Sequence, residues 1–576
     1  MSTVNFRAFP LYFLGLGALV AACSDNSPTL PGGGNAGTNS ASAGTSSASA
    51  GTNSAAGSDA AAGSASGGSD ATAGSSSGGS AGSGGSTPTS GSGSGGSAGA
   101  AGGSAPVGFE RPMGQLPNTA RDPANVDVPR DQWKKDLVSP TMDNLHHHNQ
   151  PTVLNGFLNL NGNEEFWFWD ISDPAKPVQM TEYLTPNRDP KGGGKLEGEA
   201  ESHCVSYGRY GNKFYEVTTG GHGVDIWDVT NQMDVKHIKQ IKLEGIDYGD
   251  FTAAVWGLSW QGNYIYVGGT DTGVHILDAH DPLNVTFVKR LPTSAFGTVS
   301  AGPLDAIGNV LVITTPKESA GIATLDISDP VNPKYMHSIK PTAKSYIGQF
   351  YKHFVFLQSP LRVWDVLTDP YNIGAADKPL SQVTTPGSEY LSFGDDNLFL
   401  GRLRPDGGVT VYDVTDPTKA MTKKSTVWGR LDLGGLNDDQ FSIMIGNLIV
   451  LGDDQEPYAG TVIAQWAADP DKKPPVVDTI IPRDKSTGQS VKSRIGISFT
   501  DNIEFATVNE ASFIVRPVGG EPIKGTWGSR MGVLNFSPNE DLKPGTTYEV
   551  VLPKGGITDL VRNPIAEEFK STFTTK

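Results

Sequence analysis

Histidine and carboxylate side chains gather at two places in the chain where they would suit a divalent metal ion. His146 and His148 belong to a run of three histidines, and Glu201 stands two residues before His203 in an acidic segment. Side chains alternate along an extended segment, so Glu201 and His203 would share one face. Neutral imidazole and carboxylate are ligands of divalent metals. These four residues are the candidate metal ligands, and a solvated or hydrogen-bonded loop is the alternative interpretation.

The elements that would position these side chains repeat along the chain. Six segments of alternating apolar character end in Asp and continue into a turn: FWFWDISDP, GVDIWDVTN, GVHILDAHDP, GIATLDISDP, LRVWDVLTDP and GVTVYDVTDP. A seventh segment, TVIAQWAADP, places Ala467 where the Asp is expected. Successive copies lie about 39 to 58 residues apart, which is close to the length of a propeller blade.

A second short apolar strand precedes the repeated segment in each unit, often after a Gly-Asn turn, as in GNKFYEV and GNLIVLGD. Each unit therefore contains several short strands with period-two alternation, and no long helical periodicity competes with them. Such small sheets bury both faces when they stack around an axis. The sequence predicts an all-β fold with a roughly seven-bladed β-propeller over residues 144–473.

The recurring Asp has a structural interpretation rather than a catalytic one. It follows a strand and precedes a turn, so we expect its carboxylate to accept backbone N–H groups of that turn.

A fixed offset before the Gly-Asn strand of each unit is expected to border the central channel of the propeller. The histidine run and His203 occupy this offset in the first two units, and Trp256, Tyr346 and Tyr390 occupy it in later ones. The three aromatic residues are candidate ligand-stacking residues, and packing between blades is the alternative.

The repeated phrases resemble the LVIVD repeat family, over roughly residues 144–474. The resemblance implies a β-propeller of bacterial surfaces, and it assigns no activity.

The first residues have the pattern of an export signal. Arg7 precedes an apolar stretch, and the segment Val20-Ala21-Ala22-Cys23 resembles the bacterial lipobox. The resemblance implies a signal peptide over residues 1–22 and a lipid on Cys23 that attaches the chain to the membrane. By resemblance to Gram-negative sorting rules, Ser24 after the Cys favours the outer membrane. We also expect the protein to face the cell surface. An ordinary signal peptide cut near Ala22 is the alternative.

Residues 23–106 consist almost wholly of Ser, Gly, Ala, Thr and Asn. This composition cannot bury enough apolar surface to offset the entropy of ordering, so the sequence predicts a disordered tether. Residues 107–143 form a lead-in segment before the propeller.

Residues 474–576 contain about seven short apolar strands separated by Gly, Pro and Asn turns, a pattern that favours a β-sandwich. The opening PPVVDTIIP, the segment Leu542–Tyr548 and Asp559 before Asn563-Pro564 closely resemble the SbsA-type bacterial Ig-like domain. By resemblance, such domains are spacers or adhesive units of surface proteins.

The net charge of −17 argues against a nucleic acid as partner. The chain has two cysteines, so once Cys23 carries a lipid, Cys204 has no disulfide partner and is expected to be a small buried residue.

Together these features favour a non-enzymatic cell-surface lipoprotein that binds or scaffolds a surface protein or a glycan. The alternative is a metal-binding protein or metal-dependent enzyme, with a divalent metal as cofactor at the channel mouth.

Overall fold

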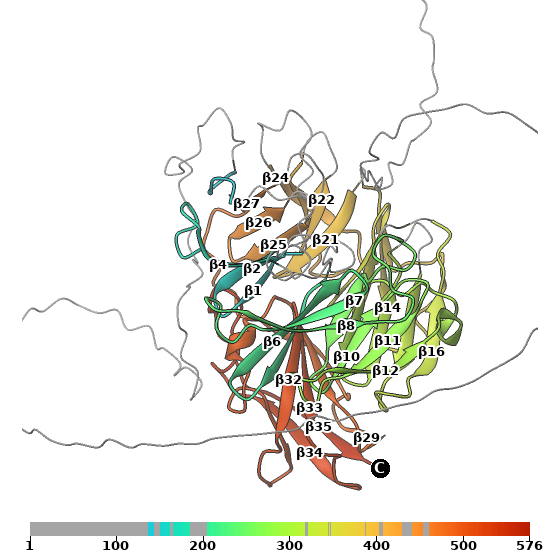
Figure 1. Cartoon of the computed structure of the whole chain (residues 1–576). Coiled ribbons are helices and arrows are strands. Elements are labelled where there is room, and N and C mark those ends of the chain that lie inside the picture. The colour runs from blue at the N-terminus through green and yellow to red at the C-terminus, as the bar shows by residue number, and fades with distance from the viewer. Residues whose placement is uncertain are drawn as a thin grey trace, which may run out of the picture. The chain divides into compact units, whose positions relative to one another are not determined.

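The computed structural model describes residues 136–142, 150–161, 165–184, 204–316, 321–343, 345, 347–385, 388–402, 407–428, 441–452 and 460–576 (Figure 1). These residues form β-strands and two short 3-10 helices, η3 (Thr293–Phe296) and η4 (Phe505–Thr507). No helix within the described ranges is long and apolar enough to cross a membrane. The predicted all-β fold is confirmed. The signal peptide, Cys23 and the tether lie outside the described residues.

The propeller region consists of successive antiparallel units in which each strand pairs with the next one along the chain. Unit 1 contains β1 (Thr152–Leu154), β2 (Phe157–Asn161), β3 (Glu165–Asp170) and β4 (Val178–Leu184), and unit 2 contains β5 (Ser206–Tyr210), β6 (Lys213–Gly220), β7 (Gly223–Asp228) and β8 (Lys236–Lys242). Unit 3 contains β9 (Gly257–Trp260), β10 (Tyr264–Gly268), β11 (Val274–Asp278) and β12 (Thr286–Leu291), and unit 4 contains β13 (Leu304–Ile307), β14 (Val310–Thr314), β15 (Ile322–Asp326) and β16 (Lys334–Ile339).

The later units follow the same order. Unit 5 contains β17 (Gly348–Tyr351), β18 (Phe354–Leu357), β19 (Leu361–Asp365) and β20 (Ser381–Val383), and unit 6 contains β21 (Ser388–Gly394), β22 (Asn397–Arg402), β23 (Val409–Asp413) and β24 (Thr422–Val427). Unit 7 contains β25 (Phe441–Ile445), β26 (Leu448–Gly452) and β27 (Thr461–Gln465).

Apolar clusters lie between neighbouring units and join them into a ring. Unit 7 and unit 1 share one such cluster, in which Ile443 and Val450 pack with Leu158 and Trp167. Every other neighbouring pair of units shares a cluster of the same kind. A fully buried apolar side chain of this size contributes about 1.5 to 3 kcal/mol, so stacking is the main stabilisation of the ring.

A segment from before unit 1 completes the sheet of unit 7. Leu137 forms an antiparallel bridge with Ala464 of β27, and the backbone N–H of Val138 donates to the carbonyl of Ile463 over 2.8 Å. The N–H of Met142 donates to the carbonyl of Thr461 over 2.8 Å. The ring is thus closed by pairing between the two ends of the propeller sequence, because residues 137–142 lie along the free edge of β27.

The repeated Asp has the predicted structural role in all six units that carry it. In each unit its Oδ1 accepts the backbone N–H of the residue two positions later, over distances from 2.8 to 3.1 Å. The prediction for the seventh unit was wrong by two residues. Leu448 pairs with Gln465, as Asn397 pairs with Asp413, so Gln465 and not Ala467 occupies the Asp position. Gln465 Nε2 donates to the carbonyl of Ala467 instead.

The C-terminal residues form the predicted Ig-like sandwich of two sheets. One sheet contains β28 (Val477–Ile481), β30 (Ile495–Phe499), β33 (Val533–Pro538) and β32 (Gly525–Arg530), and the other contains β29 (Ser486–Gln489), β35 (Phe569–Thr575), β34 (Thr547–Leu552) and β31 (Ile514–Pro517). Phe499, Phe536 and Phe573 are buried between the sheets.

The sandwich and the propeller share one sheet and one apolar core. Strand β32 pairs antiparallel with β5, which gives an eight-stranded sheet of order β28-β30-β33-β32-β5-β6-β7-β8. The cluster around Phe499 and Phe536 also contains Phe157 and Phe168 of unit 1 and Trp227 of unit 2. The two domains therefore form a single packed body, which sequence analysis did not predict.

Candidate ligand site in the propeller channel

The first strand of each unit lies innermost in the ring. Contacts between β5 and β9, β9 and β13, β17 and β21, and β21 and β25 place these strands beside one another along the axis. The turn that follows each first strand lies at one end of the channel, and the residues that begin each first strand lie toward the other end. The end that carries the turns contacts the sandwich, and the candidate ligand site lies toward the other end.

The sandwich covers the end of the ring that carries the turns. Both carboxylate oxygens of Glu504 accept backbone N–H groups of the unit 1 turn, from Asn155 and Gly156, each over 2.7 Å. In unit 4, Asn535 Oδ1 accepts the N–H of Gly308 over 2.9 Å. Units 2, 3, 5 and 6 make comparable contacts. The turns that follow the first strands thus form the docking surface for the sandwich.

The β32–β33 hairpin enters the channel beside β5. Gly528 lies opposite Gly208, and a Cβ at Gly528 would overlap the carbonyl oxygen of Trp260. A Cβ at Gly208 would in turn overlap the ring of Trp260. Ser206 Oγ donates to the carbonyl of Ser529 over 2.9 Å. Two paired glycines therefore allow the hairpin to approach the inner strand this closely.

Arg530 lies at the tip of this hairpin and is 5% exposed. Its Nη1 forms an ion pair with Asp305 Oδ1 over 2.5 Å, and its Nε donates to Cys204 Sγ over 3.0 Å. Burial opposes the charge on Arg530, but Asp305 and Cys204 together outweigh burial and raise the pKa of the guanidinium. Burial raises the pKa of the Cys204 thiol. The predicted burial of Cys204 is confirmed, and the tip carries a fixed positive charge.

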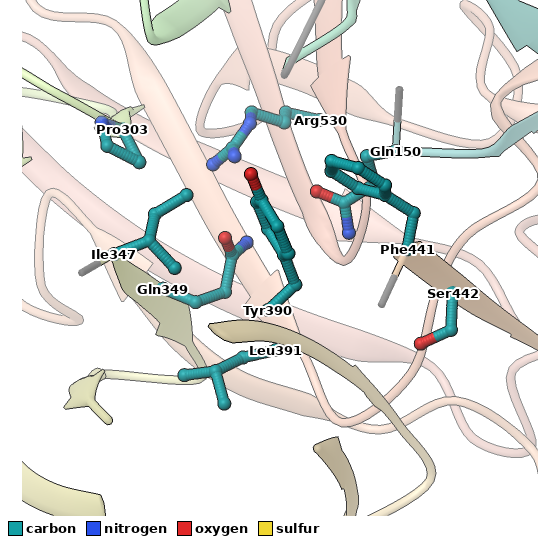
Figure 2. Close-up of a pocket in the computed structure, with 9 residues that line it drawn as sticks. All are labelled: Gln150, Pro303, Ile347, Gln349, Tyr390, Leu391, Phe441, Ser442 and Arg530. Carbon is teal, nitrogen blue, oxygen red and sulfur yellow. The ribbon is translucent and has the colours of Figure 1, made fainter. Parts of the chain in front are cut away.

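Beyond the hairpin tip lies a pocket whose floor is Arg530 (Figure 2). Its cavity volume is about 10 Å³, which is room for about one small, water-sized group. The other polar residues that line it are Gln150, Gln349, Tyr390 and Ser442, and the apolar ones are Pro303, Ile347, Leu391 and Phe441. Most of these begin the first strands of their units or stand just before them, so the pocket lies at the end of the channel that the sandwich does not cover.

Among the aromatic candidates, the structure places Tyr390 in this pocket and Trp256 elsewhere. The Tyr390 ring packs against Phe441 with centroids 4.1 Å apart. Trp256 packs against Phe251 at 4.9 Å and does not line the pocket. Both candidates are buried, at 6% and 4% exposed, so neither presents an open ring face for stacking.

Other candidates from the sequence lie outside the described residues. They are Cys23, His146, His148, Glu201, His203 and Tyr346. Sequence analysis missed Arg530 and Gln349, which line the pocket, because no local motif marks either residue.

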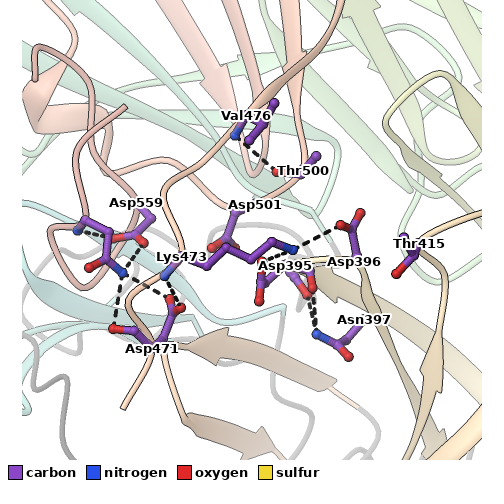
Figure 3. A network of polar contacts seen from close by, with 12 residues as sticks. Asp395, Asp396, Asn397, Thr415, Asp471, Lys473, Val476, Thr500, Asp501 and Asp559 are labelled. Atoms are coloured by element: carbon purple, nitrogen blue, oxygen red, sulfur yellow. Dashed lines mark hydrogen bonds and ion pairs between the residues drawn. The ribbon is translucent and has the colours of Figure 1, made fainter. Parts of the chain in front are cut away.

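Three carboxylates from separate segments meet where the sandwich joins the propeller (Figure 3). Asp471, Asp501 and Asp559 each place an oxygen within 4.8 Å of the others. Burial raises the pKa of Asp559 to about 7. Burial, and then the charge of Asp559, raise the pKa of Asp501 well above its usual range. Lys473 pairs with Asp395 of unit 6 over 2.6 Å beside this cluster.

Another buried carboxyl, that of Glu216, lies between units 1 and 2. Glu216 is fully buried and accepts hydrogen bonds from Asn159 Nδ2 over 2.7 Å and Asn161 Nδ2 over 3.1 Å. Burial raises the pKa of Glu216 to about 8, so the group is largely protonated at neutral pH.

Comparisons with known proteins identify both parts of the molecule. Residues 471–575 match the family model of a bacterial Ig-like domain, and residues 162–185 and 254–293 match that of the LVIVD repeat. Both kinds of domain are typical of extracellular and surface proteins. No curated protein matches the chain.

The solved structures that the chain matches include two proteins of low sequence identity. The computationally designed Ika8 protein is 12% identical with a TM-score of 0.38, and the match covers 57% of this chain and 100% of that one. Saccharomyces cerevisiae Sqt1 is 8% identical with a TM-score of 0.34, and the match covers 54% of this chain and 81% of that one. The family matches carry the identification: the chain contains LVIVD repeats in its propeller and a bacterial Ig-like domain after it.

Proposed function

We propose that the chain is a non-enzymatic lipoprotein of the cell surface that binds a partner through the end of its propeller that the sandwich does not cover. Lipidated Cys23 attaches it to the outer membrane, and residues 23–106 act as a tether. The partner is a surface protein or a glycan. Rigid frames with open ends and variable loops suit such binding.

The docking of the sandwich is the observation that supports this proposal. Contacts from Glu504, Asn535 and the β32–β33 hairpin fix the sandwich to the turn end of the ring. One end of the channel is therefore unavailable to a partner, while the Arg530 pocket lies toward the other end. A rigid body in which the sandwich occupies only one end of the channel is the arrangement expected of a surface receptor or scaffold.

Protease treatment of intact cells tests the location. A protease added outside should degrade the propeller while a periplasmic marker protein stays intact. A Cys23→Ala variant should be lost from the membrane fraction, because no lipid holds it there. Full protection of the propeller on intact cells would place the protein in the periplasm and contradict the proposal.

Elemental analysis of the purified chain tests the non-enzymatic role against the metal alternative. We expect no stoichiometric divalent metal. A bound metal that a His203→Ala variant loses would favour the metal-dependent alternative instead.

A further inference from the structure

The pocket in the channel contains hydrogen-bond donors without matching acceptors. Arg530 uses Nε for Cys204 and Nη1 for Asp305, and its Nη2 donates to none of the residues that the structure describes. Gln150 Nε2 and Gln349 Nε2 both point to Met531 Sδ, at 3.8 and 3.4 Å. A thioether is a weak acceptor, so these amides are poorly satisfied. Gln349 is buried and Gln150 is half-buried, and a buried donor normally has an oxygen partner.

Arg530 lines two pockets, on two sides of the hairpin tip, and its counter-ion Asp305 lines only one of them. Asp305 lines a second pocket, on the side of Asp501 and Lys352, and does not line the pocket that contains Gln150 and Tyr390. The latter pocket therefore faces the guanidinium but not its counter-ion. This arrangement favours a group with negative charge and oxygen acceptors.

Size and charge restrict that group further. Arg530 is already paired with Asp305, so a phosphate dianion would add two uncompensated charges to the buried site and a monoanion adds only one. The walls formed by Ile347, Tyr390 and Phe441 are apolar or aromatic and buried. A planar monoanion at the end of a narrow ligand can accept hydrogen bonds from the donors at the floor of the pocket. The rest of the ligand then lies near the mouth of the pocket.

We propose that the Arg530 pocket binds a carboxylate group, held by Arg530 Nη2 and the amides of Gln150 and Gln349. This inference rests on the proposed binding role of the uncovered channel end. The carboxylate belongs either to a peptide C-terminus or to a small organic acid, because both present the same planar monoanion.

Calorimetric titration of the full chain tests the proposal with three probes. These are N-acetyl-Gly-Gly with a free carboxylate, the same peptide as its C-terminal amide, and propionate. The free acid should bind at least about tenfold more tightly than the amide, since a hydrogen bond to a charged group contributes more than a neutral one. Binding of propionate at comparable strength would identify an organic acid as the source, and its absence would identify a peptide C-terminus.

Substitutions locate the site. Gln349→Leu keeps the side-chain volume and removes a donor, so it should weaken binding of the acid about tenfold. Gln382→Leu, on the exposed face of β20, is the matched control and should leave binding unchanged. The double variant Arg530→Met with Asp305→Asn removes both members of the ion pair together and should abolish binding, and Gln349→Leu decides the question if the double variant does not fold.

Equal binding of acid and amide, no binding of any probe, or unchanged affinity in Gln349→Leu would overturn the inference. None of these outcomes affects surface location, which the protease experiment measures separately. Failure of the carboxylate site and failure of the proposed function are therefore distinguishable.

Discussion

At the residue scale, each repeated Asp stabilises the turn that follows its strand. Asp326 Oδ1 accepts the N–H of Ser328 over 2.8 Å. We expect Asp326→Ala to lower the free energy of unfolding by about 1 kcal/mol, because a hydrogen bond in a turn is lost. Asp326→Asn retains an acceptor and should cost less. Urea denaturation of both variants measures the difference, and equal stability of the alanine variant and the parent would contradict this role.

Position 528 tolerates substitution less well than the Asp positions, because the group that a side chain at Gly528 would meet is backbone. A Cβ there would overlap the carbonyl oxygen of Trp260, which has no flexible side-chain end that could move away. Gly528→Ala should therefore destabilise the chain by about 1 to 3 kcal/mol, the usual cost of overpacking. Gly249→Ala is the control, since its Cβ would meet only the side-chain oxygen Oδ1 of Asp247, at 3.4 Å. Chemical denaturation of the two variants should separate them clearly.

The Asp turns were predictable from sequence and the Arg530 site was not, for a physical reason. An Asx turn depends on residues two positions apart, so the local pattern is sufficient. Arg530 contacts Asp305 and Cys204, which lie 225 and 326 residues away. The position of Gln465 was misread because the register of β27 against β26 depends on pairing, and the turn pattern alone did not fix it.

At the element scale, the carboxylates at the junction make stability depend on pH. Asp559 titrates with a pKa of about 7 in the folded chain and near 4 when unfolded, so the folded state favours the protonated form. Its contribution to stability is complete below about pH 4 and is lost as pH rises through about 7. Asp559→Asn should therefore raise the urea midpoint at pH 8 and change it little at pH 4.

Asp413 provides the opposite case. The backbone N–H of Thr415 donates to its carboxylate and lowers its pKa. Stability from Asp413 is therefore present above about pH 4 and is lost as pH falls below that value. Asp413→Asn should not raise the midpoint at pH 8. If Asp559→Asn and Asp413→Asn change the urea midpoint at pH 8 in the same direction, the junction carboxylates do not cause the pH dependence of stability.

The conformation of the turns between strands could be predicted from sequence, but their contacts with the sandwich could not. The Gly-Asn pairs were predicted as turns because their sequence favours that conformation. The second role of the pair Gly308-Asn309, as part of the docking surface for the sandwich, depends on Asn535 and Ser493, which belong to another domain. No local propensity contains that information.

At the scale of the whole molecule, the sequence indicated a propeller and a separate sandwich, each with its own core. The alternation of strands was sufficient for both folds. It did not show that β32 would continue the sheet of β5, or that Phe157 and Phe499 would belong to one cluster. Both features arise because the sandwich inserts a hairpin into the channel. As a result, unfolding of the sandwich would expose apolar surface of the propeller, and unfolding of the propeller would expose apolar surface of the sandwich.

The propeller and the sandwich should therefore unfold together. Hydrogen exchange measured across a urea series should show peptides from 257–291 and 533–552 losing protection at the same concentration, because the shared sheet and core couple them. Gly528→Ala weakens the hairpin contact, so in that variant the sandwich peptides should lose protection at lower urea than the ring peptides. Separate transitions in the parent chain would show that the eight-stranded sheet contributes little coupling, since the domains would then be opening independently.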